Sequence, residues 1–139
     1  MPDDTSAILL VEDHVDTANL FAKLLRRDDH HVAVASDYAS ALTLAQSRRF
    51  DVLVCDIGLP DGDGCDLLRE VRALYPIRGL AVTGYATDRH LRRCVEAGFD
   101  AHLVKPVGLE AVRAALAGIT KVSWRAAPED HGWTAQHPA

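Results

Sequence analysis

Short apolar runs recur along the chain, and stretches in which apolar residues return at helical spacing separate them. Most of the runs are uninterrupted rather than alternating with polar residues, which is typical of strands buried on both faces of a parallel sheet. The five runs are Ala7–Val11, Val32–Ala35, Val52–Cys55, Gly79–Thr83 and Ala101–Val104. The pattern therefore predicts five buried strands.

The stretches after these runs have apolar residues mostly three or four positions apart, which places them on one face of a helix. The residues that mark the five predicted helices are Ala18, Phe21 and Leu25; Tyr38, Leu42 and Ala45; Leu67, Val71 and Leu74; Leu91, Cys94, Val95 and Gly98; and Leu109, Val112, Leu116 and Ile119. Successive βα units predict an α/β fold, because right-handed crossovers place helices on both faces of a parallel sheet. We expect a three-layer sandwich.

The helical spacing stops after about Thr120. The remaining segment, residues 121–139, is rich in proline, glycine, histidine and alanine and holds both tryptophans. We expect one domain over residues 6–120, followed by a disordered C-terminal tail. A linker or a partner-binding peptide is the alternative for that tail.

The composition argues against some classes of function. The formal net charge is -5, and this acidic balance argues against direct nucleic-acid binding, which needs clustered Lys and Arg. No apolar run is long enough to cross a bilayer, and the acidic first residues lack the pattern of a signal peptide. We expect a cytoplasmic protein that does not insert into a membrane.

The cysteines give no motif. Cys55, Cys65 and Cys94 form no CxxC pair, so the sequence indicates neither a disulfide framework nor a zinc site. Scattered cysteines of this kind fit a reducing cytosol.

Three acidic residues stand at the ends of two predicted strands. Glu12 and Asp13 follow the first apolar run, and Asp56 follows the third. Ligands of a doubly wound sheet bind beyond the carboxyl ends of the strands, where the strand order reverses; an order of 2-1-3-4-5 makes these two strands neighbours there. Two carboxylates about 5 Å apart repel by roughly 3 kcal/mol at an effective dielectric constant near 20. A cation relieves that repulsion, and oxygen ligands at an open site suit Mg²⁺.

Two more strand ends carry groups that serve phosphate chemistry. Thr83 closes the fourth run and Lys105 follows the fifth, so a hydroxyl and an ammonium group join the acids at one edge of the sheet. Each acid also has a structural alternative. Glu12 and Asp13 can cap the next helix, and Asp56 can belong to the turn after it. The combination is what a phosphoryl site needs.

Together and in this order, these motifs resemble the response-regulator receiver family of two-component signalling. The matching residues are Leu9-Leu10-Val11-Glu12-Asp13, Asp56, Leu59-Pro60-Asp61-Gly62, Thr83-Gly84 and Lys105-Pro106, within a resemblance that covers residues 6 to 119. The resemblance implies a flavodoxin-like (βα)5 sandwich with strand order 2-1-3-4-5. It also implies a switch that works by phosphorylation.

The resemblance assigns the acids their roles. Asp56 is the nucleophile that accepts a phosphoryl group from a phosphohistidine donor. Asp13, Asp56 and the backbone carbonyl of Gly58 ligate Mg²⁺, and Glu12 does so directly or through water.

The other matching residues act on the phosphoryl group or relay the signal. Thr83 donates a hydrogen bond to the phosphoryl group, Lys105 contacts its oxygens, and the Lys105–Pro106 peptide bond is cis. In the family, a Tyr or Phe of the fifth strand swings inward and couples the site to the surface around strands and helices four and five. His102 stands at that position here, with a half-exposed strand residue as the alternative.

The implied function is a switch module with at most slow self-catalysed phosphorylation and dephosphorylation, not a multiple-turnover enzyme. The expected partners are a histidine kinase or histidine phosphotransfer protein, a downstream protein target and, as an alternative assembly, a phosphorylation-linked homodimer. The sequence does not distinguish a stand-alone regulator or phosphorelay intermediate from a receiver that belongs to a hybrid kinase or a longer regulator.

Three rival functions use a sheet of a similar kind. A Mg²⁺-dependent phosphohydrolase of the haloacid-dehalogenase type uses a DxDx motif after strand one, whereas residues 12 to 16 have a different spacing. A flavodoxin-like FMN protein needs a Ser/Thr/Gly-rich phosphate loop, which is absent there. A degenerate receiver that works without phosphate conflicts with the intact set of acids, threonine and lysine.

Overall fold

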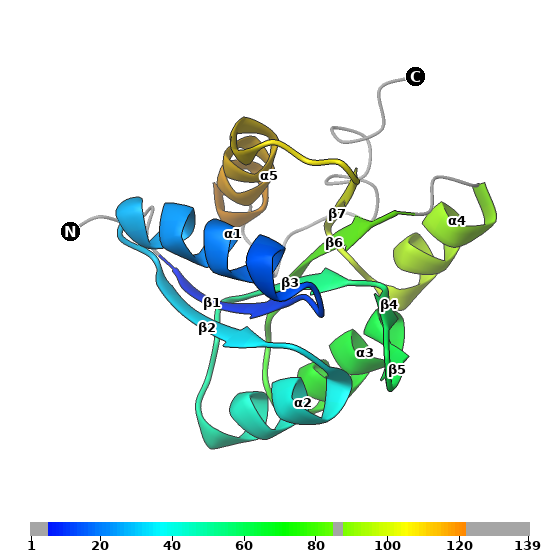
Figure 1. The fold of residues 1–139 in the computed structure, drawn as a ribbon. Coiled ribbons are helices and arrows are strands. Elements are labelled where there is room, and N and C mark those ends of the chain that lie inside the picture. Colours follow the sequence, from blue (N-terminus) through cyan, green and yellow to red (C-terminus); the bar gives the residue numbers. More distant parts are fainter. Residues whose placement is uncertain (1–5, 85–87, 122–139) are drawn as a thin grey trace.

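The computed structural model describes residues 6–84 and 88–121, in which helices surround a central sheet (Figure 1). In chain order the elements are β1 (Ala7–Val11), α1 (Val15–Arg27), β2 (His31–Ala35), α2 (Tyr38–Ser47), β3 (Val52–Asp56), β4 (Gly58–Leu59), β5 (Gly62–Asp63), α3 (Gly64–Leu74), β6 (Arg78–Thr83), α4 (Asp88–Ala97), β7 (Ala101–Val104) and α5 (Leu109–Lys121). Each predicted strand and helix is present, with bounds that differ by a few residues.

The long strands form one parallel sheet with the order β2-β1-β3-β6-β7. This is the predicted order 2-1-3-4-5, because the short strands β4 and β5 pair only with each other, as an antiparallel hairpin. The flavodoxin-like α/β sandwich is therefore confirmed. The hydrophobic pattern does not predict the hairpin, since two-residue strands have too few positions to show a period.

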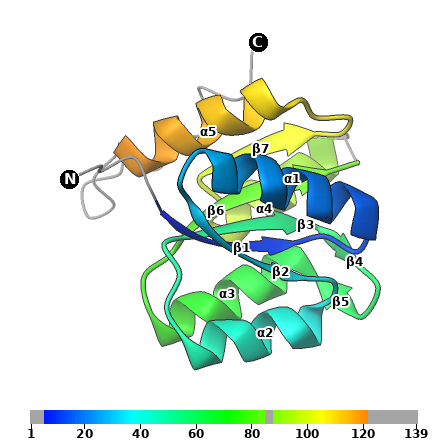
Figure 2. The same cartoon turned by 60° about the vertical axis from the view of Figure 1, so that its left-hand side comes forward.

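Helices cover both faces of the sheet (Figure 2). Helices α1 and α5 pack on one face, and α2, α3 and α4 pack on the other. Alternate residues of β1 enter the two cores: Ile8 and Leu10 pack with α1 and α5, whereas Leu9 and Val11 join the opposite core. The central strand β3 is buried along its whole length, which explains its uninterrupted apolar run.

Two residues that mark predicted helices lie outside the core. Leu74 is 48% exposed and Val95 is 41% exposed. Leu74 is the last residue of α3, and Val95 follows the buried Cys94 by one position, which is about 100° around the helix. The helical period therefore locates these helices correctly but assigns these two side chains to the wrong environment.

The C-terminal boundary is described only in part. Helix α5 ends at Lys121, the first residue of the predicted tail, and the rest of that tail lies outside the described residues. The domain limits of 6–120 therefore stay a prediction. Within residues 6–84 and 88–121, no helix combines the length and the apolar character that crossing a membrane requires.

Candidate functional site

The predicted site residues come from four strand ends at one edge of the sheet. Asp56 is the last residue of β3 and Thr83 the last of β6, while Glu12 directly follows β1 and Lys105 directly follows β7. Lys105 and Glu12 are 93 positions apart in the sequence, yet their side chains meet. Parallel strands bring them together because all their carboxyl ends lie at the same edge.

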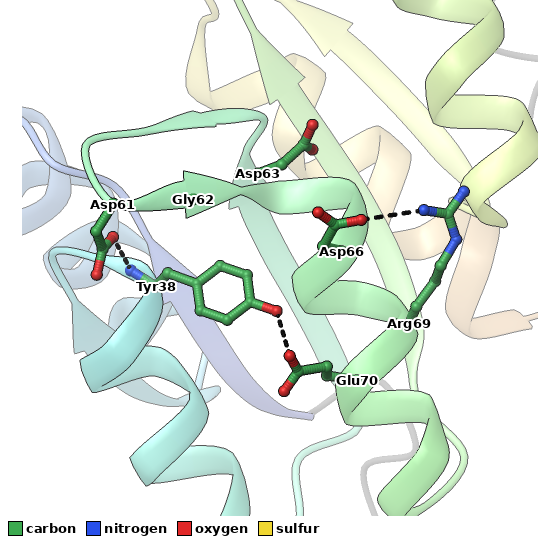
Figure 3. A pocket seen from close by; sticks show the side chains of 7 residues that line it. All are labelled: Tyr38, Asp61, Gly62, Asp63, Asp66, Arg69 and Glu70. Carbon is green, nitrogen blue, oxygen red and sulfur yellow. Dashed lines mark hydrogen bonds and ion pairs between the residues drawn. The ribbon is translucent and has the colours of Figure 1, made fainter.

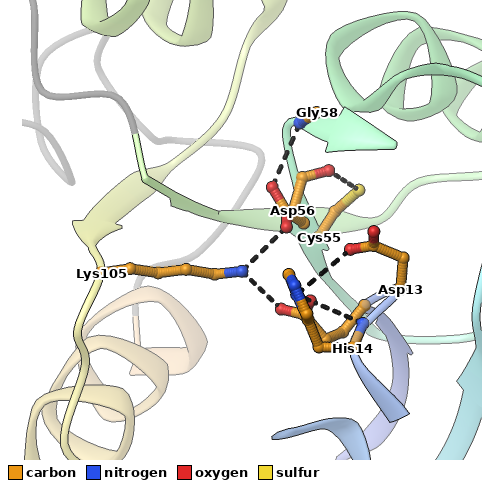
Figure 4. A network of polar contacts seen from close by, with 7 residues as sticks. Asp13, His14, Cys55, Asp56, Gly58 and Lys105 are labelled. Atoms are coloured by element: carbon orange, nitrogen blue, oxygen red, sulfur yellow. Dashed lines mark hydrogen bonds and ion pairs between the residues drawn. The ribbon is translucent and has the colours of Figure 1, made fainter. Parts of the chain in front are cut away.

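Lys105 bridges the two buried carboxylates (Figure 4). Its Nζ donates to Glu12 Oε1 at 2.8 Å and to Asp56 Oδ2 at 2.9 Å. Glu12 is 4% exposed and Asp56 is 8% exposed, so water screens their charges poorly. The single positive charge of Lys105 therefore offsets part of the repulsion between the carboxylates of Glu12 and Asp56.

The pKa values of the pair reflect this contact. Burial works to raise the pKa of Glu12, but hydrogen bonds from Lys105 and His14 outweigh it, and the pKa lies below its usual value. Burial works to lower the pKa of Lys105, but the carboxylates of Glu12 and Asp56 outweigh it, and the pKa lies above its usual value. Both groups of the Lys105–Glu12 pair are therefore charged near neutral pH.

The second oxygen of Asp56 is held by the backbone. The N–H of Gly58 donates to Asp56 Oδ1 at 3.1 Å. The structure thus brings Gly58 to the site through its N–H group, whereas the resemblance gives its carbonyl a role as metal ligand. Carbonyl ligation stays a prediction.

Three successive residues after β1 bring metal-ligating atoms together at the same edge. Glu12, Asp13 and His14 each offer a ligand atom, and these atoms lie within 4.8 Å of one another. His14 Nδ1 is 3.0 Å from Glu12 Oε2 and 3.6 Å from Asp13 Oδ1. The sequence predicts Glu12 and Asp13 but not His14, whose only signal is its position next to two acids.

Neither acid after β1 caps helix α1 with its side chain. His14 occupies the N-cap position, and its side chain makes no capping hydrogen bond. Glu12 Oε2 instead accepts the backbone N–H of His14 at 3.1 Å, while Glu12 Oε1 faces Lys105. The capping alternative for these acids is therefore wrong, because Glu12 points into the site.

The ends of β6 and β7 are fixed to each other. Thr83 is fully buried, and its backbone carbonyl accepts the N–H of Lys105 at 2.8 Å. The Lys105–Pro106 peptide bond is cis, as the resemblance implies. His102 in β7 is 4% exposed, so the alternative of a half-exposed strand residue is wrong.

A separate acidic hollow lies beside the β4–β5 hairpin (Figure 3). It is lined by Tyr38, Asp61, Gly62, Asp63, Asp66, Arg69 and Glu70. Its polar groups bind one another: the hydroxyl of Tyr38 donates to Glu70 at 2.7 Å, and Asp61 accepts the backbone N–H groups of Tyr38 and Ala39. The hollow contains none of the predicted site residues. Its hydrogen bonds hold the start of α2 against the hairpin and against α3.

Comparison with protein families gives a match over most of the chain. A family model described as "Response regulator receiver domain" matches residues 8–117. The match spans β1 through most of α5 and contains every predicted site residue.

Individual relatives agree with this match. The chain is 32% identical over 117 residues to the sensor histidine kinase RcsC of Salmonella typhi, an alignment that covers 82% of this chain and 12% of the kinase. The chain thus spans only a small part of that curated relative.

Solved structures show the same fold. A CheY-like response regulator receiver domain protein from Methanospirillum hungatei matches with a TM-score of 0.79 and 26% identity, covering 84% of this chain and 94% of that one. A response regulator protein from Burkholderia pseudomallei, solved with a phosphorylated aspartic acid, a calcium ion and citrate, matches with a TM-score of 0.76 and 30% identity, over 83% of this chain and 68% of that one.

Proposed function

The chain belongs to the response regulator receiver family, and on that premise we propose that it is a phosphorylation-dependent signalling switch with Asp56 as its phosphoacceptor. One observation carries the proposal: the Asp56 carboxylate ends the central strand, with Lys105 Nζ on one oxygen at 2.9 Å and the Gly58 N–H on the other at 3.1 Å. The carboxylate is thus fixed in place beside a cation that can move to an incoming anion.

Each residue then has a defined task in phosphoryl transfer. An oxygen of Asp56 attacks the phosphorus of a phosphohistidine donor, the P–N bond breaks, and the leaving imidazole nitrogen keeps the bonding electrons and takes up a proton. The transition state is loose and spreads charge over three equatorial oxygens. Lys105 balances that charge, and the Thr83 hydroxyl donates a hydrogen bond to the phosphoryl group. Positioning and charge therefore supply most of the catalysis.

A magnesium ion fits the donor set of this edge. Glu12, Asp13 and Asp56 bring three carboxylates, against which Lys105 is a single ammonium group, so the site retains net negative charge. Carboxylate oxygens suit a hard divalent cation. We assign Asp13, Asp56 and the Gly58 carbonyl as ligands, with Glu12 acting directly or through water. Bound there, Mg²⁺ supplies charge neutralisation between the nucleophile and the phosphoryl group.

The partners follow from the same chemistry. The donor is a histidine kinase or a histidine phosphotransfer protein, and the signal passes to a downstream protein target or through a phosphorylation-linked homodimer. We place the module in the cytoplasm, without direct contact to nucleic acid. Its own chemistry is limited to slow phosphorylation and dephosphorylation, because a switch has to hold its phosphoryl group long enough to be recognised.

The test is to locate the phosphoryl group. The purified chain is incubated with a small phosphodonor and Mg²⁺, and borohydride then reduces the acyl phosphate to an alcohol, with release of phosphate, before digestion for mass spectrometry. We expect one modified residue per chain, homoserine in place of Asp56 in the peptide of residues 50–69, and loss of this label when a chelator removes the metal.

Three results would contradict the proposal. One is a label on any residue other than Asp56. Another is steady release of inorganic phosphate over many rapid turnovers, which would favour a phosphohydrolase. The third is a yellow flavin chromophore in the purified protein, which would favour an FMN-binding protein.

His102 is the proposed switch residue. His102 is buried in β7, which pairs with the strand that ends at Thr83, and a His102→Ala exchange removes the side chain that we propose couples the site to α4. We expect an unchanged rate of Asp56 phosphorylation, with the phosphorylation-induced change in amide hydrogen exchange over α4 reduced about fivefold. Leu25→Ala, a buried truncation on α1, is the matched control and should leave that change intact. Equal loss of phosphorylation and of the α4 response in His102→Ala would refute the role.

A further inference from the structure

The three cysteines gather in one part of the core. Cys55 lies in β3, Cys65 in the first turn of α3 and Cys94 in α4, and each is at most 1% exposed. All three belong to the same hydrophobic core cluster and are free thiols. The sequence shows no CxxC motif, so only the packing of α3 against α4 brings the last two together.

Cys65 lies close to the backbone beside Cys94, whereas Cys55 makes a different contact. Cys65 Sγ lies 3.9 Å from the backbone carbonyl oxygen of Arg93, the residue before Cys94, and the pKa of each of these two thiols is shifted mainly by the other thiol. Cys55 Sγ contacts its own neighbour instead, the carbonyl oxygen of Asp56 at 3.1 Å. We propose that Cys65 and Cys94 form a redox modification site, which a peroxide converts into a disulfide joining α3 to α4.

The reaction balances with hydrogen peroxide as the oxidant. The Cys94 sulfur, as thiolate, attacks one peroxide oxygen, the O–O bond breaks, and the hydroxide released takes up a proton to form water. The Cys65 sulfur then attacks the Cys94 sulfenic acid, and a second water leaves as the S–S bond forms. Two thiols are oxidised by two electrons, and one peroxide is reduced to two waters.

The local electrostatics favour this order of events. Interaction with the Cys65 thiol is the main influence on Cys94 and holds the pKa of its thiol below the usual value. Interaction with Cys94, together with burial, raises the pKa of Cys65. Cys94 is therefore the more readily ionised thiol and attacks the peroxide first, and Cys65 gives up its proton to the departing hydroxide as its sulfur resolves the sulfenic acid.

The crosslink would join α3, which comes after the strand that ends at Asp56, to α4, which comes after the strand that ends at Thr83. Helix α3 begins eight positions after Asp56, and Cys94 lies eleven positions after Thr83. An ion pair between Asp63, the N-cap residue of α3, and Arg93 of α4 already connects the two helices nearby. A covalent bond beside it would prevent α4 from moving relative to α3, so oxidation would oppose the α4 rearrangement; this consequence, unlike the disulfide itself, rests on the proposed function.

The test uses the full folded chain and hydrogen peroxide. After oxidation, remaining thiols are blocked and the chain is digested with trypsin without reduction. Because Cys55 and Cys65 lie on the same tryptic peptide, residues 50–69, the Cys55→Ala variant is oxidised in parallel. We expect this peptide to be linked to the one that begins at Cys94, in the parent chain and in Cys55→Ala alike, and released by a reducing agent.

The controls separate the proposed pair from other outcomes. Cys65→Ser and Cys94→Ser should each lose the linked peptide entirely, and Asp56→Asn should form it like the parent, since the oxidation requires no phosphorylation. A link that survives in Cys65→Ser, a Cys55–Cys65 bond within one peptide, or thiols that all remain free in the folded parent would overturn the proposal. Oxidation in urea gives the reference for pairing without the fold.

Discussion

An Asp56→Asn chain should take up no phosphoryl group from a small phosphodonor, whereas an Asp51→Asn chain should be labelled like the parent. The two aspartates flank the same central strand. Asp56 ends β3 beside Lys105, but Asp51 precedes β3 at the opposite edge, where its carboxylate accepts the Ala7 N–H at 2.8 Å. The amide is nearly isosteric but neutral and weakly nucleophilic, so we expect more than about a 1000-fold loss of labelling rate.

Asparagine at position 56 keeps part of the local structure, which makes the comparison informative. Its side-chain oxygen can still accept the Gly58 N–H, and Lys105 retains its contact with Glu12. Urea unfolding of both variants shows that they are folded at the assay temperature. Undiminished labelling of Asp56→Asn would overturn the assignment of the phosphoacceptor. Equal loss in Asp51→Asn, with the fold intact, would place the chemistry elsewhere.

The order of the elements and the edge that holds the site follow from the sequence. Strand β3 reads as a continuous apolar run because both of its faces are covered, and Asp56 interrupts that run where the strand ends. Thr83 is the last residue of another run, and Lys105 directly follows a third one. Chain direction alone then brings these side chains to one edge, since parallel strands share a carboxyl end.

The partners of individual side chains could not be predicted in the same way. Whether Lys105 binds one carboxylate or bridges two depends on side-chain reach and on burial, which a linear pattern does not contain. The capping alternative for Glu12 failed for this reason: Glu12 lies two positions before the N-cap residue His14, and its side chain turns toward Lys105. The neighbourhood of Cys65 and Cys94 likewise arises from helix packing and has no sequence motif.

Core residues outside periodic segments were also missed. Phe99 lies in the connection between α4 and β7, where no strand or helix period applies, yet it is 2% exposed and among the largest fully buried side chains. A Cβ added to Gly79 would approach its ring to 2.8 Å. The ring therefore covers β6 where that strand lacks a side chain, which makes a loop residue part of the core.

Replacing Phe99 with alanine should lower the free energy of unfolding by about 3–5 kcal/mol, because truncating a buried aromatic ring loses its burial and leaves a cavity. Domains of this kind are stable by only about 5–15 kcal/mol, so the urea midpoint should fall substantially. Leu74→Ala removes a side chain that is 48% exposed and, as the control, should change stability by less than about 0.5 kcal/mol.

The contact between Phe99 and Gly79 makes the prediction specific. Gly79→Ala alone should destabilise the fold by about 1–3 kcal/mol, because its methyl group would overlap the Phe99 ring and the nearby Leu68 side chain. In the Phe99→Ala background the same methyl group enters the vacated space, so its cost should shrink or reverse, and the two changes should not be additive. Additive effects in urea unfolding, or a Phe99→Ala loss no larger than that of Leu74→Ala, would show that the ring does not complete the core over β6.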